Sequence, residues 1–452
     1  MEKFFKLRKN GTTARTECIA GITTFMTMAY ILAVNPLILG STGMDSGAVF
    51  TATALSSALA GVMMALFANL PFALSAGMGL NAFFAYTVVG QMGYSWQLAL
   101  TAVLVEGLIF IVLSATNIRE ALFNAIPMTL KSAVSVGIGL FIAFIGFQNA
   151  HIVVPGPKLV AMFSFTNAFQ QGTFHSEGIS VLLALLGILV TAVLVMKNVR
   201  GNILLGIFIV WGLGMILEIA GIYIPDPEHG YFSLLPHGIV AWPQSFMPTF
   251  MQFDFHHVMT LDFLVVMFAF LFVDLFDTLG TLIGCASRAR MLDEHGRLPN
   301  IKGALMADAC GTTLGACLGT STISTFVESS AGIMEGGRTG LTALVTSFLF
   351  LIAMFFSPIF LAVPSFATAP ALIIVGFLMM QQVVRVPWDN LLEAIPAFIC
   401  IAVMPFMYSI SEGIAFGIIS YTILHIAGGR AKDVTWLMYV LTVMFILKYA
   451  WL

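Results

Sequence analysis

The residues best suited to chemistry in this chain lie in one polar stretch, Gly319 to Gly340, with the sequence GTSTISTFVESSAGIMEGGRTG. The stretch lies between long apolar runs, yet it is rich in Ser, Thr and Gly and carries the acid Glu328. Such residues at membrane depth are tolerated where the backbone lines a cavity or is buried in protein. We interpret the stretch as a broken membrane segment that holds a substrate; a polar re-entrant loop with only a packing role is the alternative.

A second interrupted segment lies in the first half of the chain, at Pro71–Tyr86 (PFALSAGMGLNAFFAY). Gly77 and Gly79 open its backbone, and Asn81 adds an amide. It occupies the position in the first half that Ser321–Gly332 occupies in the second. Two matched, glycine-interrupted segments indicate the central site of a transporter. Glycine-rich close packing of helices is the alternative.

Two acids lie inside the apolar segment Leu271–Gly284 (LFVDLFDTLGTLIG). Asp274 and Asp277 are three residues apart, so they share a helix face with Thr278. Each acid costs about 2.5–3.5 kcal/mol at the centre of a membrane helix. We therefore expect them to bind protons or to face water or a polar ligand. Bridging of helices through backbone amides is the alternative.

Other polar side chains are embedded in apolar runs. Glu106 and Asp308 are either structural or part of a proton path. Near the start of the chain, Thr27 and Tyr30 continue a stripe of threonines at helical spacing. The stripe predicts a face toward the site, although threonines often bond back to their own helix.

The composition is that of a polytopic membrane protein. The chain has 452 residues, 59% hydrophobic and 9% charged, against about 25% charged in soluble domains. Its five cysteines show no CxxC spacing, so no disulfide framework or zinc site is implied. Walker A, GxGxxG, HExxH and GxSxG motifs are missing. We therefore expect no ATP-driven pump, no enzyme, no metal or organic cofactor and no nucleic-acid partner.

Hydropathy predicts fourteen spans in two sets of seven. They are 17–40, 47–69, 72–90, 97–115, 128–147, 178–197, 202–221, 261–285, 302–318, 320–336, 339–359, 366–384, 389–407 and 410–427. A further run, Val434 to Ala450, lies at the membrane interface or spans it thinly. Seven spans per half would make the two halves inverted repeats, at residues 1–222 and 261–427. Residues 428–452 would then form a C-terminal interfacial or extra hydrophobic segment.

The basic residues predict the orientation. With the N-terminus in the cytoplasm, the loops outside carry only Lys158. The cytoplasmic loops between spans then carry ten cations, namely Arg119, Lys197, Arg200, Arg288, Arg290, Arg297, Arg338, Arg385, Arg430 and Lys432. We expect a multi-pass protein of the plasma or inner membrane.

Four motifs together resemble the AzgA-like branch of the nucleobase–cation symporters, the bacterial adenine and guanine/hypoxanthine permeases. They are TARTECIAGITTFMTMAYILAVNP, SAGMGLNAFFAY, FVDLFDTLGTL and GTSTISTFVESSAGIMEGGRTGLTA. The resemblance covers nearly the whole chain. It implies an all-α membrane fold of seven plus seven inverted spans, in which short β-strands break spans 3 and 10. It also implies a core domain (16–115 and 261–359), a gate domain (126–222 and 363–427) and a homodimer.

The resemblance assigns substrate binding to Asp274 and Glu328, with Asn81 near the base and Asp277 in support. Phe326 stands where the uracil permeases have an aromatic residue, and Val327 replaces their glycine. Thr278 replaces a histidine of that branch, so a proton role would fall to the acids here.

The function predicted from these observations is uptake of a purine base by proton symport, with alternating access. Hypoxanthine and guanine are favoured over adenine. A carboxylate would accept the N–H groups of the base, Phe326 and Phe83 would cover its ring, and Thr27 and Val327 would line the site. Asp274, Asp277, Asp308 and Glu328 are the candidate proton carriers. The alternatives are an uncoupled facilitator, an anion transporter of the same architecture, and an intramembrane enzyme.

Overall fold

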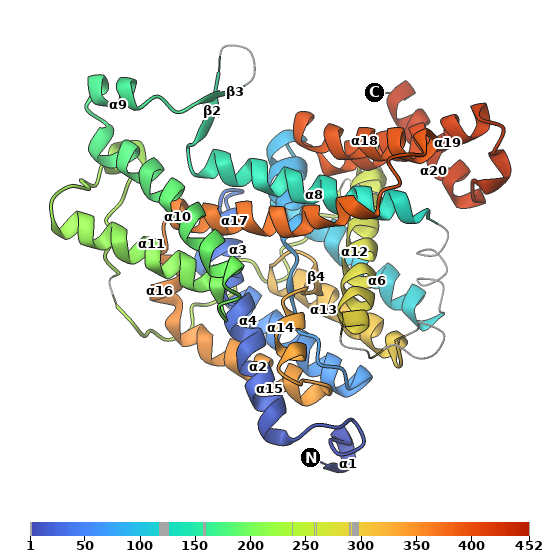
Figure 1. The fold of residues 1–452 in the computed structure, drawn as a ribbon, viewed down its shortest axis with the longest axis horizontal. Coiled ribbons are helices and arrows are strands. Elements are labelled where there is room, and N and C mark those ends of the chain that lie inside the picture. Colours follow the sequence, from blue (N-terminus) through green and yellow to red (C-terminus); the bar gives the residue numbers. More distant parts are fainter. Residues whose placement is uncertain are drawn as a thin grey trace.

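The computed structural model describes residues 2–116, 126–156, 160–236, 238–256, 258, 260–288, 291 and 298–451. Helices dominate this part of the chain (Figure 1), and nine helical segments within it are long and apolar enough to cross a membrane. The exact number of spans stays a prediction. Four of the cations used to predict the orientation, Arg119, Lys158, Arg290 and Arg297, lie outside the described residues.

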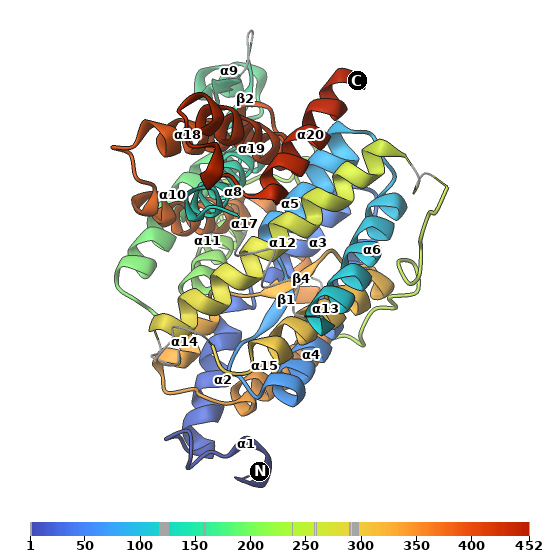
Figure 2. The same ribbon diagram turned by 90° about the vertical axis from the view of Figure 1, so that its right-hand side faces the viewer.

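The long helices pack in two groups, which Figure 2 shows side by side. The group around the strand pair, here the first bundle, comprises α2 (Ala14–Met28), α3 (Ile31–Gly40), α4 (Ser46–Met63), β1 (Leu74–Ala76), α5 (Met78–Ala82), α6 (Trp96–Ala115), α12 (Leu261–Arg288), α13 (Ile301–Leu318), β4 (Ile323–Thr325), α14 (Ser329–Met334) and α15 (Gly340–Ala353). The second bundle comprises α8 (Met128–Asn149), α10 (Ile179–Met196), α11 (Asn202–Ile219), α17 (Ser365–Met380), α18 (Leu391–Phe406), α19 (Ile410–Ala427) and α20 (Trp436–Trp451).

Shorter elements connect or flank these bundles. They are α1 (Glu2–Phe5), the π-helical segments η1 (Met64–Ala68), η2 (Phe83–Gln91) and η3 (Phe174–Gly178), the hairpin of β2 (Val153–Pro155) and β3 (Val160–Met162), α9 (Phe165–Gln171) and α16 (Ser357–Leu361), with 3₁₀ turns at 227–229, 354–356, 381–385 and 431–433.

The two segments predicted to be broken form the strand pair at the centre of the first bundle. β1 and β4 run antiparallel, with Leu74 opposite Thr325 and Ala76 opposite Ile323. Strand pairing satisfies the backbone groups that no helix satisfies at this depth. A Cβ on Gly77 would lie 2.6 Å from the hydroxyl oxygen of Ser324, so the close approach needs glycine. The prediction that short strands break these two spans is confirmed.

Side chains fix where the helices begin. Asp45 caps α4, Ser95 caps α6 and Thr339 caps α15, each by accepting a bond from a backbone N–H two or three residues on. Glu17 of α2 also holds the segment at the start of α15. Its buried carboxylate accepts a hydrogen bond from the backbone N–H of Arg338 at 2.8 Å. This carboxylate ties the first span to the segment that follows α14.

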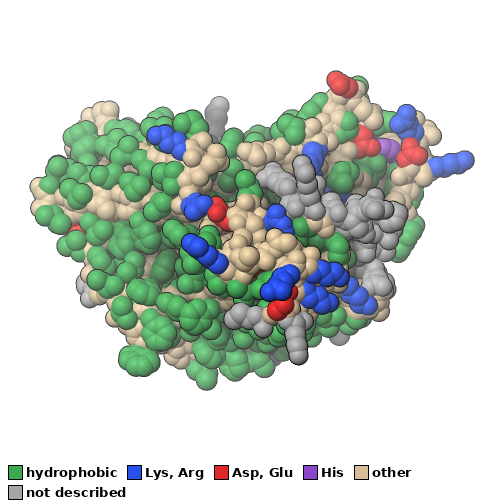
Figure 3. All heavy atoms as spheres, turned by 60° about the horizontal axis from the view of Figure 1, so that its bottom comes forward, with side chains coloured by type: hydrophobic (Ala, Val, Ile, Leu, Met, Phe, Trp, Pro, Cys, Tyr) green, Lys and Arg blue, Asp and Glu red, His purple; other side chains and the backbone are tan. Residues whose placement is uncertain are grey.

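The run at the C-terminus forms α20, which packs on α19. The hydroxyl of Thr442 donates to that of Thr422 at 2.8 Å across this contact. α20 is therefore part of the second bundle. The face drawn in Figure 3, which turns the bottom of Figure 1 forward, is largely hydrophobic, and a group of Lys and Arg side chains lies near its centre.

Candidate functional site

The polar stretch around β4 is held by side chains from several other elements. Three hydroxyls of the stretch donate to side chains of other elements: Ser321 to Asn81, Thr322 to Glu106 at 2.8 Å, and Ser324 to Asp277 at 2.9 Å. Two groups of the stretch accept: the hydroxyl of Thr320 from Asn35 at 2.9 Å, and the carboxyl of Glu328 from Tyr30 at 2.8 Å.

These bonds explain the enrichment of hydroxyls in the stretch. They come from α3, α5, α6, α12 and the turn between α2 and α3, so the broken segment is anchored on several sides. Buried polar groups that are hydrogen-bonded help to hold a segment in one position. Much of the Ser and Thr content therefore serves to hold the backbone, and Asn81 is committed to Ser321.

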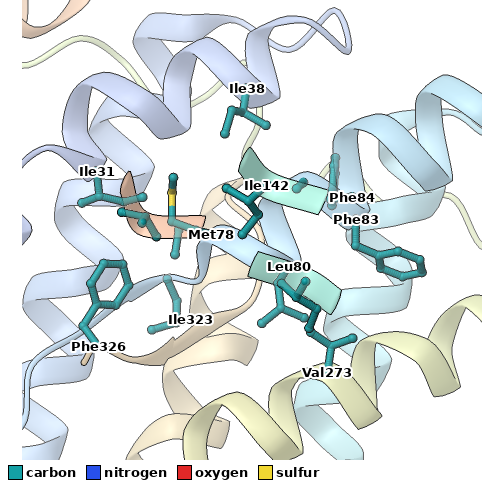
Figure 4. Packing of buried hydrophobic residues seen from close by; sticks show 14 of the residues in the cluster. Ile31, Ile38, Met78, Leu80, Phe83, Phe84, Ile142, Val273, Ile323 and Phe326 are labelled. Atoms are coloured by element: carbon teal, nitrogen blue, oxygen red, sulfur yellow. The ribbon is translucent and has the colours of Figure 1, made fainter. Parts of the chain in front are cut away.

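Glu328 lies three residues after the end of β4 and directly before α14. Its side chain makes no capping bond to that helix. Val327 is half exposed, whereas Phe326 is buried. Figure 4 shows Phe326 beside Ile31 and Ile323. The residues predicted around the ligand from span 10 thus lie together, next to the break in the first span.

The two acids of α12 have different surroundings. Asp277 accepts from the hydroxyl of Ser324 on β4 at 2.9 Å. Asp274 is fully buried and accepts from the hydroxyl of Thr278 at 2.9 Å. The same hydroxyl lies 2.8 Å from a carboxyl oxygen of Asp308 on α13. The structure therefore brings all four predicted acids to one region, with Asp277 nearest the strand.

Two residues predicted to contact the ligand, Phe83 and Thr27, pack or bond mainly with other residues. Phe83 is fully buried with its ring 4.7 Å from that of Phe270, and Figure 4 shows it beyond Leu80, away from Phe326. Thr27 donates to the carbonyl of Thr24 at 2.8 Å and reaches the backbone carbonyl of Glu328 only at 3.5 Å.

Among the described residues, no three His, Cys, Asp or Glu side chains are grouped so as to hold a metal ion. The chemistry available at the strand pair is that of carboxyls, hydroxyls and an amide.

Comparison with known proteins defines the family. A family model described as a permease family (Xan_ur_permease) matches residues 15–432. The chain belongs to this permease family. Adenine permease AdeP of Escherichia coli is 42% identical over 99% of this chain and 95% of its own. Guanine/hypoxanthine permease PbuG of Bacillus subtilis is 43% identical over the full length of both chains, and PbuO of the same organism is 41% identical over 98% and 99%. The protein is thus a multi-pass membrane transporter.

Solved structures with the same fold are more distant in sequence. The transmembrane domain of the cyanobacterial bicarbonate transporter BicA aligns with a TM-score of 0.61 at 16% identity, over 89% of this chain and 97% of that one. The murine anion transporter Slc26a9 aligns with a TM-score of 0.65 at 12% identity, over 92% and 68%. This likeness confirms the predicted all-α fold of inverted repeats for the permease.

Sequence reasoning missed several side chains that hold this permease's site. Asn35 donates to both Thr53 and Thr320, although it precedes a proline in an otherwise apolar helix. Ser75 of β1 bonds to Ser57 of α4 at 2.7 Å. For Asn35 the only signal was a lone polar residue in an apolar run, and Ser75 lies in the interrupted segment Pro71–Tyr86. Neither signal identifies a partner on another element.

Proposed function

We propose that this permease takes up purine nucleobases, hypoxanthine and guanine in preference to adenine, by proton symport with alternating access. The observation that carries the proposal is that two carboxyls lie beside the strand pair, in a chain similar over its full length to adenine and guanine/hypoxanthine permeases: Asp277 accepts from Ser324 of β4, and Glu328 lies three residues after β4. The preference among purines rests on the N1–H group that hypoxanthine and guanine have and adenine lacks, because a carboxylate accepts from such a group, and guanine adds an adjacent amine.

The acids favour a neutral ligand rich in N–H groups over an anion. A carboxylate accepts hydrogen bonds from such groups, and bonds to a charged acceptor are the strong ones. Anionic ligands would be repelled by the same carboxylates. Although the bicarbonate and anion transporters share the fold, the side chains around β4 therefore support a base as the ligand.

The coupled proton is proposed to move among the four acids near the strand pair. Thr278 has one hydroxyl hydrogen, yet its oxygen lies within bonding distance of both Asp274 and Asp308. Two charged carboxylates on one hydroxyl would repel each other in a medium of low dielectric, whereas a proton on either carboxyl supplies the second bond. Asp274, Asp308, Asp277 and Glu328 are the proposed carriers, and the buried position of Asp274 favours proton storage there.

The two bundles are proposed to act as core and gate, with the base carried by the first bundle as it moves against the second. The N-terminus is proposed to lie in the cytoplasm, because Thr12 bonds to Gly336 and Arg200 pairs with Glu335 at one basic end of the molecule. A homodimer in the cell membrane is proposed from the family resemblance.

Uptake of labelled adenine, hypoxanthine, guanine and uracil by transport-deficient cells, with and without a protonophore, tests the proposal. Glu328→Gln is expected to lower kcat/KM for the preferred purine by about tenfold to a hundredfold, because it removes an acceptor bond made by a charged group. Glu393→Gln, which changes a carboxyl bonded to a tyrosine in the second bundle, is the matched control. Uptake that ignores both the protonophore and Glu328→Gln would contradict proton symport through this site, and uptake of uracil alone would contradict the purine assignment.

A further inference from the structure

A tyrosine at the break of the first span reaches the central acid. α2 ends at Met28 and α3 begins at Ile31, so Tyr30 lies in the turn between them. Its side chain is 1% exposed. Its hydroxyl donates to a carboxyl oxygen of Glu328 at 2.8 Å.

Close packing of α14 on α2 sets this distance. A Cβ on Gly332 would lie 2.1 Å from the hydroxyl oxygen of Thr24 and 2.5 Å from the carbonyl oxygen of Ala20. Glycine therefore lets α14 lie directly against the first span. With both backbones held, the tyrosine and the glutamate meet in one geometry.

We propose that Tyr30 is a positioning residue for Glu328. A carboxylate has two oxygens, and a phenol fully enclosed by protein holds one of them in a fixed direction. The second oxygen is then held in one direction as well, ready for N–H groups of a ligand. That the ligand is a nucleobase rests on the function proposed above; the orientation of Glu328 does not.

Loss of the Tyr30 hydroxyl has two consequences. The carboxylate gains freedom to rotate, so each ligand must order it again on binding, which weakens binding. The carboxyl also loses a donor that stabilises its charged form, so it retains a proton to higher pH.

The Tyr421–Glu393 pair of the second bundle provides a matched control. There too a buried tyrosine hydroxyl donates to a glutamate, at 3.3 Å, away from the strand pair.

The experiment measures binding of labelled hypoxanthine to purified protein, and uptake across pH. The variants are Tyr30→Phe, Tyr421→Phe, and the double variants of Tyr30→Phe with Glu328→Gln and of Tyr421→Phe with Glu393→Gln. Tyr30→Phe is expected to raise Kd and KM about tenfold and to shift the pH profile of uptake, whereas Tyr421→Phe changes neither.

The double variants separate positioning from general damage. Tyr30→Phe should add little to Glu328→Gln, because the hydroxyl acts through that carboxylate. Additive losses, or a Tyr30→Phe protein with wild-type Kd, KM and pH profile, would overturn the proposal.

A readout without substrate keeps this test independent of the proposed function. Labelling of Glu328 in membranes by a hydrophobic carbodiimide, which reacts with protonated carboxyls, is expected to extend to higher pH in Tyr30→Phe. Unchanged labelling overturns the role of Tyr30. Shifted labelling in a protein that binds no purine supports the role of Tyr30 and contradicts the purine assignment alone. If Tyr30→Phe does not fold, site-specific 3-fluorotyrosine, which keeps the ring and hydroxyl but is more acidic, replaces it; an unchanged labelling profile then overturns the proposal.

Discussion

The β1–β4 pair and the contact between α8 and α17 each join a segment from the first half of the chain to one from the second, but with different side chains. Around the strands, hydroxyls, amides and carboxyls form bonds of 2.7–2.9 Å to neighbouring elements. Between α8 and α17 the contact is made by glycine: a Cβ on Gly376 would lie 2.4 Å from the carbonyl oxygen of Gly139.

The β1–β4 pair and the α8–α17 contact therefore have different roles in this membrane protein. Helices in a bilayer gain no hydrophobic drive for association, so backbones that approach closely supply the packing. Such contacts depend on shape. Hydrogen bonds at the strand pair depend on direction, and they fix where each carboxyl points. We therefore expect changes at the strands to affect ligand binding and coupling, and changes at α8–α17 to affect stability.

The largest expected effect comes from neutralising the acids of α12 one at a time. Asp277→Asn removes the carboxyl beside β4 and should weaken binding of hypoxanthine by about a hundredfold. Asp274→Asn should leave binding within a few-fold but make uptake insensitive to a protonophore, because an amide stores no proton. Binding to purified protein and uptake in cells measure the two effects.

Asp226→Asn, in the loop after α11 where Asp226 bonds to His229, is the control for both substitutions and should behave as wild type. Loss of binding in Asp274→Asn with binding kept in Asp277→Asn would instead support the family resemblance, which assigned substrate binding to Asp274 and a supporting role to Asp277. Equal loss of both functions in each variant would show that the acids act as one unit.

A smaller effect is expected from Gly376→Ala at the α8–α17 contact. The added methyl group meets backbone, which cannot rotate away, so overpacking should cost roughly 1–3 kcal/mol of stability. The melting temperature in detergent should fall, while KM for the protein that remains folded stays near wild type. Gly212→Ala in α11, where a Cβ would meet nothing within 4 Å, is the matched control. A raised KM without lost stability would show that this contact also shapes the site.

The sequence allowed the broken segments and their meeting to be predicted, because Gly, Ser and Thr within apolar runs are incompatible with a lipid-facing helix. The spacing of Asp274 and Asp277 did not show which of them faces β4; the family resemblance gave substrate binding to Asp274, whereas Asp277 is the acid that bonds to Ser324. Residues three apart on a helix point about 60° away from each other, so one can meet β4 while the other meets Thr278. Which neighbour lies in each direction is decided by packing.

The same limit applies to residues that hold the site from a distance. Glu17 received no role from the sequence, yet it is buried against the start of α15. Its partner Arg338 lies more than three hundred residues away along the chain. A pattern along one segment carries no information about such a partner, whereas the interruption of a helix is visible in the segment itself.

The smallest expected effect concerns an ion pair between the two bundles. Arg200, at the turn between α10 and α11, pairs with Glu335 at the end of α14, at 2.5 Å. Both side chains are partly exposed, and exposed pairs contribute about 0.2–1 kcal/mol.

If the bundles move against each other during transport, Arg200→Ala should change the maximal uptake rate measurably, by up to about fivefold. Arg385→Ala, which removes an exposed cation elsewhere in the second bundle, should leave the rate unchanged. The charge-reversed double variant, Arg200→Glu with Glu335→Arg, should return the rate toward wild type, because the attraction is restored with the charges exchanged. Single variants that alter uptake without rescue in the double variant would show that each charge acts alone, and the two bundles would then share no electrostatic contact of consequence at this end.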